Sequence, residues 1–270
     1  MDTETETEKR MSQSSSLLKI AQDGDLFVLT MDRPDKRNSL NNQLIEEFIA
    51  FFERPPTEAR AVVLHGRGDH FCAGLDLMEM LATRTNNTIL EQRRSKAWYR
   101  AFDLIQFGEI PVISVLQGAV VGGGLELASA THARVAERSA FFQLPEGQRG
   151  IFVGGSGSVR IPRLIGAGRM VEMMLSARTY DADTGLQLGL AHYVVDNGTG
   201  LDFAMDLARR IATNAPTSNY AVINGIPRIA DSGHAEGLFA ETMVASMTGA
   251  DAAQRITSFF EGRKAKGQPA

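Results

Sequence analysis

Residues 111–127, PVISVLQGAVVGGGLEL, decide the fold of this chain of 270 residues. The stretch opens with the continuous apolar run Pro111–Leu116, passes Gly118, reaches the glycines at 122–124 and continues as a helical pattern from about Leu125. A continuous apolar run of this length is typical of a strand buried on both faces in a sheet covered by helices. The stretch therefore predicts a strand–turn–helix unit in an α/β fold.

A second stretch, FCAGLDL at residues 71–77, repeats this device. It follows the apolar run Ala61–Leu64 and leads into a helix that we expect around 75–81. Small residues let a ligand approach the backbone, and a helix N-terminus offers unpaired N–H groups with partial positive charge. Two such N–H groups aimed at one point form an oxyanion hole. The alternative is that the glycines serve only tight packing of strand against helix, and the residues leave both interpretations open.

The rest of the chain fits the same α/β organisation. We expect strands at 17–20, 26–31, 133–136 and 140–142, a helix that includes 44–52 and is stopped by Pro55-Pro56, a helix over about 88–107, and mostly helix beyond Ser156. Residues 1–13 are expected to form a disordered acidic tail, 14–200 an α/β core, and 201–270 a helical C-terminal region.

Composition narrows the class of protein. With 43% hydrophobic and 22% charged residues the chain has the proportions of a globular protein, and it lacks the run of about 20 apolar residues that spans a membrane. The start MDTETETEKR resembles neither a secretory signal nor an Arg-rich transit peptide. The single cysteine, Cys72, excludes an internal disulfide and fits a reducing cytoplasm. A net charge of -4 without a basic stripe argues against nucleic-acid binding.

Two acidic residues are candidates for catalysis. Glu126 lies in the first turn of the helix opened by the glycines, and Glu146 lies in a turn-rich segment after a strand. Each has an ordinary explanation, since an acid at a helix N-terminus complements the dipole and a loop carboxylate is usually solvated. Paired across a pocket, however, two carboxylates can hold a water, one taking a proton while the other supplies one. The sequence alone leaves open whether they converge.

Other catalytic motifs are incomplete. GGSGS at 154–158 comes within one residue of the G-x-S-x-G nucleophile elbow, but it ends in serine and no buried strand precedes it. Neither the dinucleotide-binding nor the P-loop glycine pattern is complete. His65, His70 and Cys72 lack the spacing of a zinc site, so we expect no metal.

Taken together, these motifs resemble the crotonase superfamily, the enoyl-CoA hydratases and isomerases. The resemblance runs from about Leu17 to Lys264 and rests on motifs that occur in this order: Arg33-Pro34, Asn38–Leu40, Phe71–Leu77, Gly118–Leu127, Pro145-Glu146, Arg163–Gly166, Gly189–Ala191 and Phe260–Lys264. It implies a spiral core of repeated ββα units and a C-terminal helical region that builds homotrimers or hexamers formed from two trimers.

The resemblance also implies a coenzyme A thioester substrate and no separate cofactor. It assigns the oxyanion hole for the thioester oxygen to the N–H groups of Ala73 and Gly123. The remaining coenzyme A contacts that it implies are Gly74, Leu75, Asp76 and Gly122, with Lys36 or Arg37 at the phosphates.

Hydratases of this superfamily carry two glutamates, and Glu126 and Glu146 fill both positions. The resemblance thus implies a lyase of fatty acid metabolism that adds water syn to an α,β-unsaturated acyl-CoA, Glu146 serving Cα and Glu126 holding the water. The alternatives are an enoyl-CoA isomerase, an aromatic acyl-CoA hydratase-lyase, a thioester hydrolase and a non-catalytic oligomer that binds coenzyme A.

The chain departs from the superfamily pattern at several positions. Gln117 stands where asparagine is usual and His132 where aspartate is usual, and the segment 147–154 lacks a proline before its last glycine. The same segment carries Gln148 and Arg149 where apolar residues are common. One hypothesis is that Arg149 or Gln148 recognises a polar or carboxylated acyl chain. The alternative is a surface arginine paired with a neighbouring acid.

Overall fold

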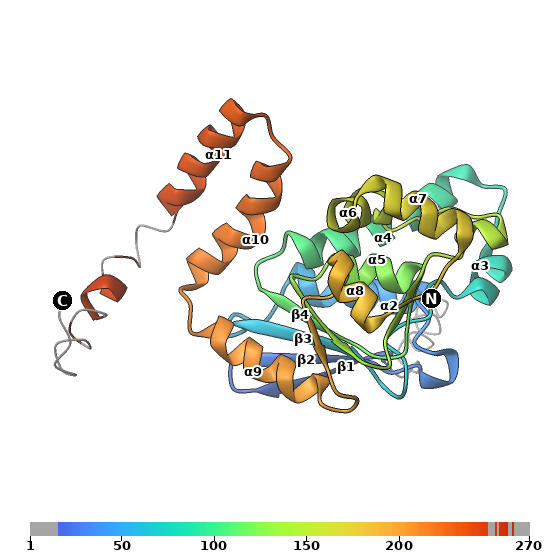
Figure 1. Cartoon of the computed structure of the whole chain (residues 1–270), viewed down its shortest axis with the longest axis horizontal. Coiled ribbons are helices and arrows are strands. Elements are labelled where there is room, and N and C mark those ends of the chain that lie inside the picture. The colour runs from blue at the N-terminus through green and yellow to red at the C-terminus, as the bar shows by residue number, and fades with distance from the viewer. Residues whose placement is uncertain (1–15, 248–251, 253, 259–260, 262–270) are drawn as a thin grey trace, which may run out of the picture.

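A six-stranded sheet organises the chain, and a computed structural model describes residues 16–247, 252, 254–258 and 261 (Figure 1). Its strands follow the order β1-β2-β3-β4-β6-β9, and every neighbouring pair is parallel except β1 with β2. Their bounds are Leu18–Asp23, Leu26–Met31, Ala61–Gly66, Val112–Leu116, Ala133–Glu137 and Tyr193–Val195. A second, three-stranded sheet has the order β5-β7-β8, with bounds Ala119–Val121, Phe141–Gln143 and Tyr180–Asp181.

Helices follow most of the strands, so the α/β expectation is confirmed. The α-helices are α2 Asn42–Glu53, α3 Leu77–Thr83, α4 Thr88–Gln106, α5 Gly123–Ser129, α6 Gly157–Ile165, α7 Ala167–Ser176, α8 Ala182–Leu188, α9 Gly200–Ala212, α10 Pro216–Ala230 and α11 His234–Met247. The chain also forms two short 3₁₀ turns, η1 Pro34–Lys36 and η2 Glu146–Arg149. No helix in this part of the chain is long and apolar enough to cross a membrane.

The apolar runs read from the sequence are buried because both faces of the large sheet are covered. On β3, Val62 and Leu64 face the main core, which includes Phe48 of α2 and Phe102 of α4. Ala61 and Val63 of the same strand face a second core that α9 completes. Figure 1 shows α9 on one side of the sheet and the other core helices opposite it. A strand between two apolar layers therefore needs an apolar residue at every position.

The decisive stretch forms the expected strand–turn–helix unit with one addition. After β4, the chain turns at Gly118, whose φ is +51°, and forms the short strand β5 beside β7 before a second turn at Gly122. The sequence pattern predicts one glycine-rich turn from Gly118 to Gly124 and a helix from about Leu125. The helix begins at Gly123 instead, because residues 119–121 are paired in a second sheet.

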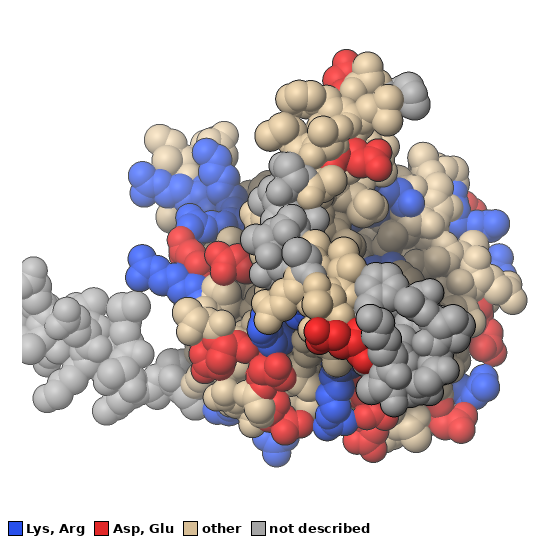
Figure 2. All heavy atoms as spheres, turned by 90° about the vertical axis from the view of Figure 1, so that its left-hand side faces the viewer, with Lys and Arg blue, Asp and Glu red and all other residues tan. Residues whose placement is uncertain are grey.

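The C-terminal helices differ in how they pack. α9 lies on the sheet, whereas α10 and α11 pack against each other and extend away from the sheets (Figure 1). On the face that carries them, Figure 2 shows acidic and basic side chains interspersed. The domain division at residue 200 stays a prediction, and the tail predicted at 1–13 lies outside the described residues.

Candidate active site

One cavity of about 320 Å³ receives most of the residues proposed from the sequence. Most of its lining comes from the turns at 73–75 and 121–123, from α3 and α4, and from the segment that runs from Pro145 to Gly155, and Asn42 of α2 and Glu126 of α5 complete it. The sequence candidates among its lining residues are Ala73, Gly74, Leu75, Gly122, Gly123, Glu126, Glu146 and Arg149. Asp76, Lys36 and Arg37 are not among them.

Two backbone N–H groups are available at the first wall of the cavity. Leu75 forms an isolated parallel bridge with Leu40, in which Leu40 N–H donates to the Gly74 carbonyl and Asp76 N–H donates to the Leu40 carbonyl. In such a bridge the flanking residues make both bonds, so the N–H of Leu75 points away from Leu40. Gly123 is the first residue of α5, and its N–H therefore has no acceptor within the helix.

These two N–H groups lie side by side. A Cβ atom placed on Gly123 would be 3.5 Å from the nitrogen of Leu75, and one placed on Gly74 would be 3.3 Å from the nitrogen of Gly123. Within the described residues, neither N–H donates a backbone hydrogen bond. The pair has the arrangement that an oxyanion hole requires, two donors directed into one cavity.

This geometry corrects the assignment of Ala73. The N–H of Ala73 already donates to the Arg37 carbonyl at 2.9 Å, so it is not available to a ligand. Leu75, which the resemblance placed only along the coenzyme A, carries the N–H that faces Gly123. The sequence could not distinguish Ala73 from Leu75, because only the backbone pairing with Arg37 and Leu40 decides which N–H in the turn has no acceptor.

Glu126 is held by three backbone N–H groups of the loop 154–157. Its Oε1 accepts from Gly154 at 3.2 Å, and its Oε2 accepts from Gly155 at 2.6 Å and Gly157 at 2.9 Å. Burial raises the pKa of Glu126, whereas these hydrogen bonds and the charge of Arg160 lower it. Because a carboxylate offers about four lone pairs, the three N–H donors leave roughly one acceptor position, on Oε1.

Glu146 reaches the cavity from η2. A Cβ atom on Gly122 would lie 2.7 Å from its Oε1, and its buried Oε2 has no hydrogen-bond partner among the described residues. Burial raises the pKa of Glu146, the negative charge of Glu126 raises it further, and Arg149 lowers it. The two acids, from α5 and η2, therefore converge on one cavity and interact electrostatically, which the sequence had left open.

The remaining candidates have different surroundings. Arg149 donates to the Pro145 carbonyl at 3.1 Å, and no carboxylate of the described chain forms an ion pair with it. Arg149 is itself exposed, and its charge lowers the pKa of the neighbouring Glu146, so the alternative of a surface arginine beside an acid stays open. Gln148 is exposed and outside the cavity lining.

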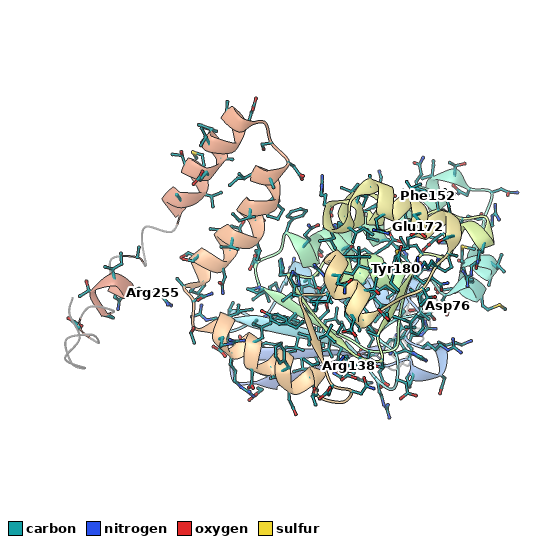
Figure 3. All side chains as sticks on the ribbon, in the orientation of Figure 1. Asp76, Arg138, Phe152, Glu172, Tyr180 and Arg255 are labelled. Carbon is teal, nitrogen blue, oxygen red and sulfur yellow. The ribbon has the colours of Figure 1, made fainter. Side chains whose placement is uncertain are left out.

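Asp76 has a structural role in place of the expected ligand contact. Its carboxylate caps α3 by accepting from Glu79 N–H at 3.2 Å and pairs with Arg33 at 2.8 Å. Figure 3 shows Asp76 and Phe152 on the side of the molecule away from α10 and α11. Lys36 and Arg37 are exposed next to this ion pair in sequence, so the expected phosphate contact with coenzyme A stays a prediction.

Sequence reasoning missed two features of the site. Trp98, whose helical spacing in the sequence predicts a core residue, does pack against the core, edge-on to Phe102 with ring centroids 6.2 Å apart, but it also lines the cavity. The loop 154–157, which the sequence analysis treats only as an incomplete nucleophile elbow, holds Glu126 through three backbone N–H groups. The closely spaced glycines in that loop were the available signal.

Comparisons with known proteins identify the family to which the chain is similar. A family model described as enoyl-CoA hydratase/isomerase matches residues 22–268. The short-chain-enoyl-CoA hydratase of Clostridium acetobutylicum is 30% identical over 255 residues, which cover 92% of this chain and 96% of that protein. The 2,3-dehydroadipyl-CoA hydratase of Escherichia coli is 30% identical over 242 residues, covering 88% and 93%.

Solved structures confirm the crotonase fold. A chain from Rhodopseudomonas palustris superposes with a TM-score of 0.87 at 45% identity, and the match covers 93% of this chain and 97% of that one. An enoyl-CoA hydratase from Bacillus anthracis superposes with a TM-score of 0.85 at 26% identity, covering 91% and 96%.

The close packing behind the two N–H groups gives a first prediction. A Cβ on Gly124 would lie 2.3 Å from the Cys72 carbonyl oxygen, so Gly124→Ala should lower the free energy of unfolding by about 1–3 kcal/mol. Gly168→Ala in α7 meets open space and should raise that free energy by roughly 0.4–1 kcal/mol. Urea denaturation of both variants checks this, and equal stability of the two would contradict the packing described.

Proposed function

The chain belongs to the enoyl-CoA hydratase/isomerase family, and on that premise we propose that it adds water syn across the α,β double bond of an acyl-CoA thioester. The observation that carries the proposal is the convergence of two carboxylates and two backbone N–H groups on one cavity. Glu126 and Glu146 supply the carboxylates, and Leu75 and Gly123 supply the N–H groups.

In the proposed reaction the two acids divide the proton transfers. The remaining acceptor position on Oε1 of Glu126 orients the water and takes its proton as the water oxygen bonds to Cβ. The electron pair of the double bond moves toward the thioester oxygen, and the N–H groups of Leu75 and Gly123 stabilise the enolate. Glu146, whose protonated form burial favours, gives a proton to Cα, and the proton on Glu126 returns to Glu146 through solvent.

Two of the alternatives use less of this site. An isomerase that moves a double bond needs one carboxylate for its proton transfers, whereas here a second carboxylate is fixed by three N–H donors. A non-catalytic binding protein would not need either acid, and the Gln148-Arg149 segment leaves the cavity present. The hydratase-lyase and hydrolase alternatives share the oxyanion hole, and analysis of the products separates them.

Several further parts of the proposal come from the family resemblance. The coenzyme A moiety belongs to the substrate, no separate cofactor takes part, and Lys36 or Arg37 contacts the phosphates. The protein is proposed to be cytoplasmic and to assemble as a homotrimer or hexamer through its C-terminal helices. Exposed apolar side chains on α10 and α11, such as Ile226, Phe239 and Met243, support an assembly at that end.

We also propose that the acyl chain ends in a carboxylate that Arg149 binds. Arg149 lines the cavity and forms no ion pair within the described chain, and an arginine can bind a carboxylate through two parallel hydrogen bonds. One of the relatives is named a 2,3-dehydroadipyl-CoA hydratase, which gives this substrate class independent support.

The central test is incubation with crotonyl-CoA in deuterated water, with substrate and product followed by mass spectrometry. We expect hydrated product that carries one deuteron at Cα. Glu146→Gln should lower kcat by about 10²–10⁴-fold, the usual contribution of a positioned acid or base, while coenzyme A binding persists. Deuterium exchange without hydration would favour the isomerase, and coenzyme A binding without either reaction would favour the non-catalytic alternative.

Substrate class is tested with Arg149→Ala and two substrates, crotonyl-CoA and a glutaconyl-type CoA that carries a terminal carboxylate. A hydrogen bond to a charged group contributes about 1.5–3 kcal/mol, so kcat/KM for the carboxylated substrate should fall roughly 10–150-fold more than for crotonyl-CoA. Arg138→Ala, on the exposed surface far from Phe152 in Figure 3, is the matched control. Equal losses on both substrates would refute the assignment of Arg149.

A further inference from the structure

We propose that Arg160 is a positioning residue, which clamps the loop 154–157 to α4 and thereby fixes the Glu126 carboxylate in the cavity. The proposal deepens the proposed function, because Glu126 is the acid that this function assigns to the water. It concerns a side chain of α6 that none of the sequence motifs singled out.

Arg160 makes hydrogen bonds in three directions. Its guanidinium donates to the Gly155 carbonyl at 2.8 Å and also to the side chains of Gln106 and Asp103, both on α4. Gly155 is also the residue whose N–H donates to Oε2 of Glu126 at 2.6 Å. Gly155 therefore links the two side chains: its carbonyl accepts from the Arg160 guanidinium, and its N–H donates to the Glu126 carboxylate.

The loop cannot hold this conformation by its own stiffness. Gly155 and Gly157 have neighbours so close that a side chain would not fit. A Cβ on Gly155 would lie 2.3 Å from the Phe102 ring, and a Cβ on Gly157 would lie 2.6 Å from Cγ of Glu126. Ser156 between them has a φ of +66°, in the left-handed region. Glycines that permit this close approach also widen the conformations open to the chain, so an external anchor is needed to select one.

The burial of Arg160 indicates more than a packing role. Only 4% of its side chain is exposed, and burying a guanidinium costs free energy unless every donor is paired. An apolar side chain would join α6 to α4 without that cost. A hydrophobe would, however, supply neither the hydrogen bond to Gly155 nor a positive charge near Glu126.

The charges around Glu126 come from several elements and act in known directions. The positive charge of Arg160 lowers the pKa of Glu126 and so favours the ionised form that accepts the three N–H bonds. Asp103 on α4 pairs with Arg160, so its negative charge opposes the effect of Arg160. Glu146 and Arg149 of η2 are further charged groups beside Glu126, Arg163 of α6 acts electrostatically on Arg160, and Glu79 and Arg94 line the same cavity.

Substitution of Arg160 and substitution of Asp103 should therefore shift the pKa of Glu126 in opposite directions. Arg160→Gln removes the cation, so the pKa of Glu126 should rise and the acidic limb of the kcat/KM profile should move to higher pH. Asp103→Asn removes the negative charge that partly neutralises Arg160. The pKa of Glu126 should therefore fall, and the acidic limb of the kcat/KM profile should move to lower pH. Loss of alignment in Arg160→Gln should also lower kcat by about 10–100-fold while KM changes much less.

The titration of Glu126 is measured in the full-length free protein by ¹³C NMR of labelled glutamate carboxyls, assigned with Glu126→Gln, and the kcat/KM profile is measured alongside. Arg163→Gln is the matched control, because Arg163 lies on the same helix but pairs with Asp231 on the surface. If Arg160→Gln does not fold, Asp103→Asn decides alone, since 57% of the Asp103 side chain is exposed.

The proposal is supported if the pKa of Glu126 rises in Arg160→Gln, falls in Asp103→Asn and is unchanged in Arg163→Gln. Unchanged titration of Glu126, or a shift of both variants in the same direction, would overturn it. The NMR titration measures the pKa of Glu126 in the protein without substrate. A wild-type chain without hydratase activity would therefore refute the proposed function and leave the titration result unaffected.

Discussion

The active site depends on the close approach of two backbone turns that only glycine permits. A Cβ on Gly74 would lie 2.7 Å from the Val121 carbonyl oxygen, and one on Gly124 would lie 2.3 Å from that of Cys72. Positive φ values at Gly74 and Gly122 add a second reason for glycine. This approach places the N–H of Leu75 beside that of Gly123, from segments that belong to different strand–helix units.

Two carboxyl groups, those of Glu126 and Glu146, lie in the same cavity as these donors, and their burial lowers the stability of the folded state. Glu126 and Glu146 are both buried and near enough for Glu126 to raise the pKa of Glu146. The raised pKa values mean that the folded state is penalised at neutral pH relative to a pH below about 4.3, where unfolded glutamate is protonated. Backbone N–H groups and Arg160 offset part of this penalty at Glu126. The same low-polarity surroundings strengthen each hydrogen bond to a developing charge.

Much of this could be predicted from the sequence, because the strong signals are local. The buried strands at 26–31, 61–66 and 112–116 follow from continuous apolar runs, and the glycine turns mark the strand–helix transitions. Which N–H remains free could not be predicted, since it depends on pairing between Leu40 and Leu75 and between Arg37 and Ala73. The role of Arg160 could not be predicted for the same reason, because its partners on α4, Gln106 and Asp103, lie 54 and 57 residues away along the chain.

The direct measurement of the central claim is the carbonyl stretching frequency of [1-¹³C]butyryl-CoA, a saturated thioester that cannot be hydrated, bound to the protein. Two N–H donors polarise the thioester carbonyl, so we expect a lower stretching frequency on the protein than in water. Gly123→Pro removes one donor at a helix position that accepts proline, and it should reverse much of the shift. A bound frequency equal to that in water would contradict the assignment of Leu75 and Gly123 as the oxyanion hole.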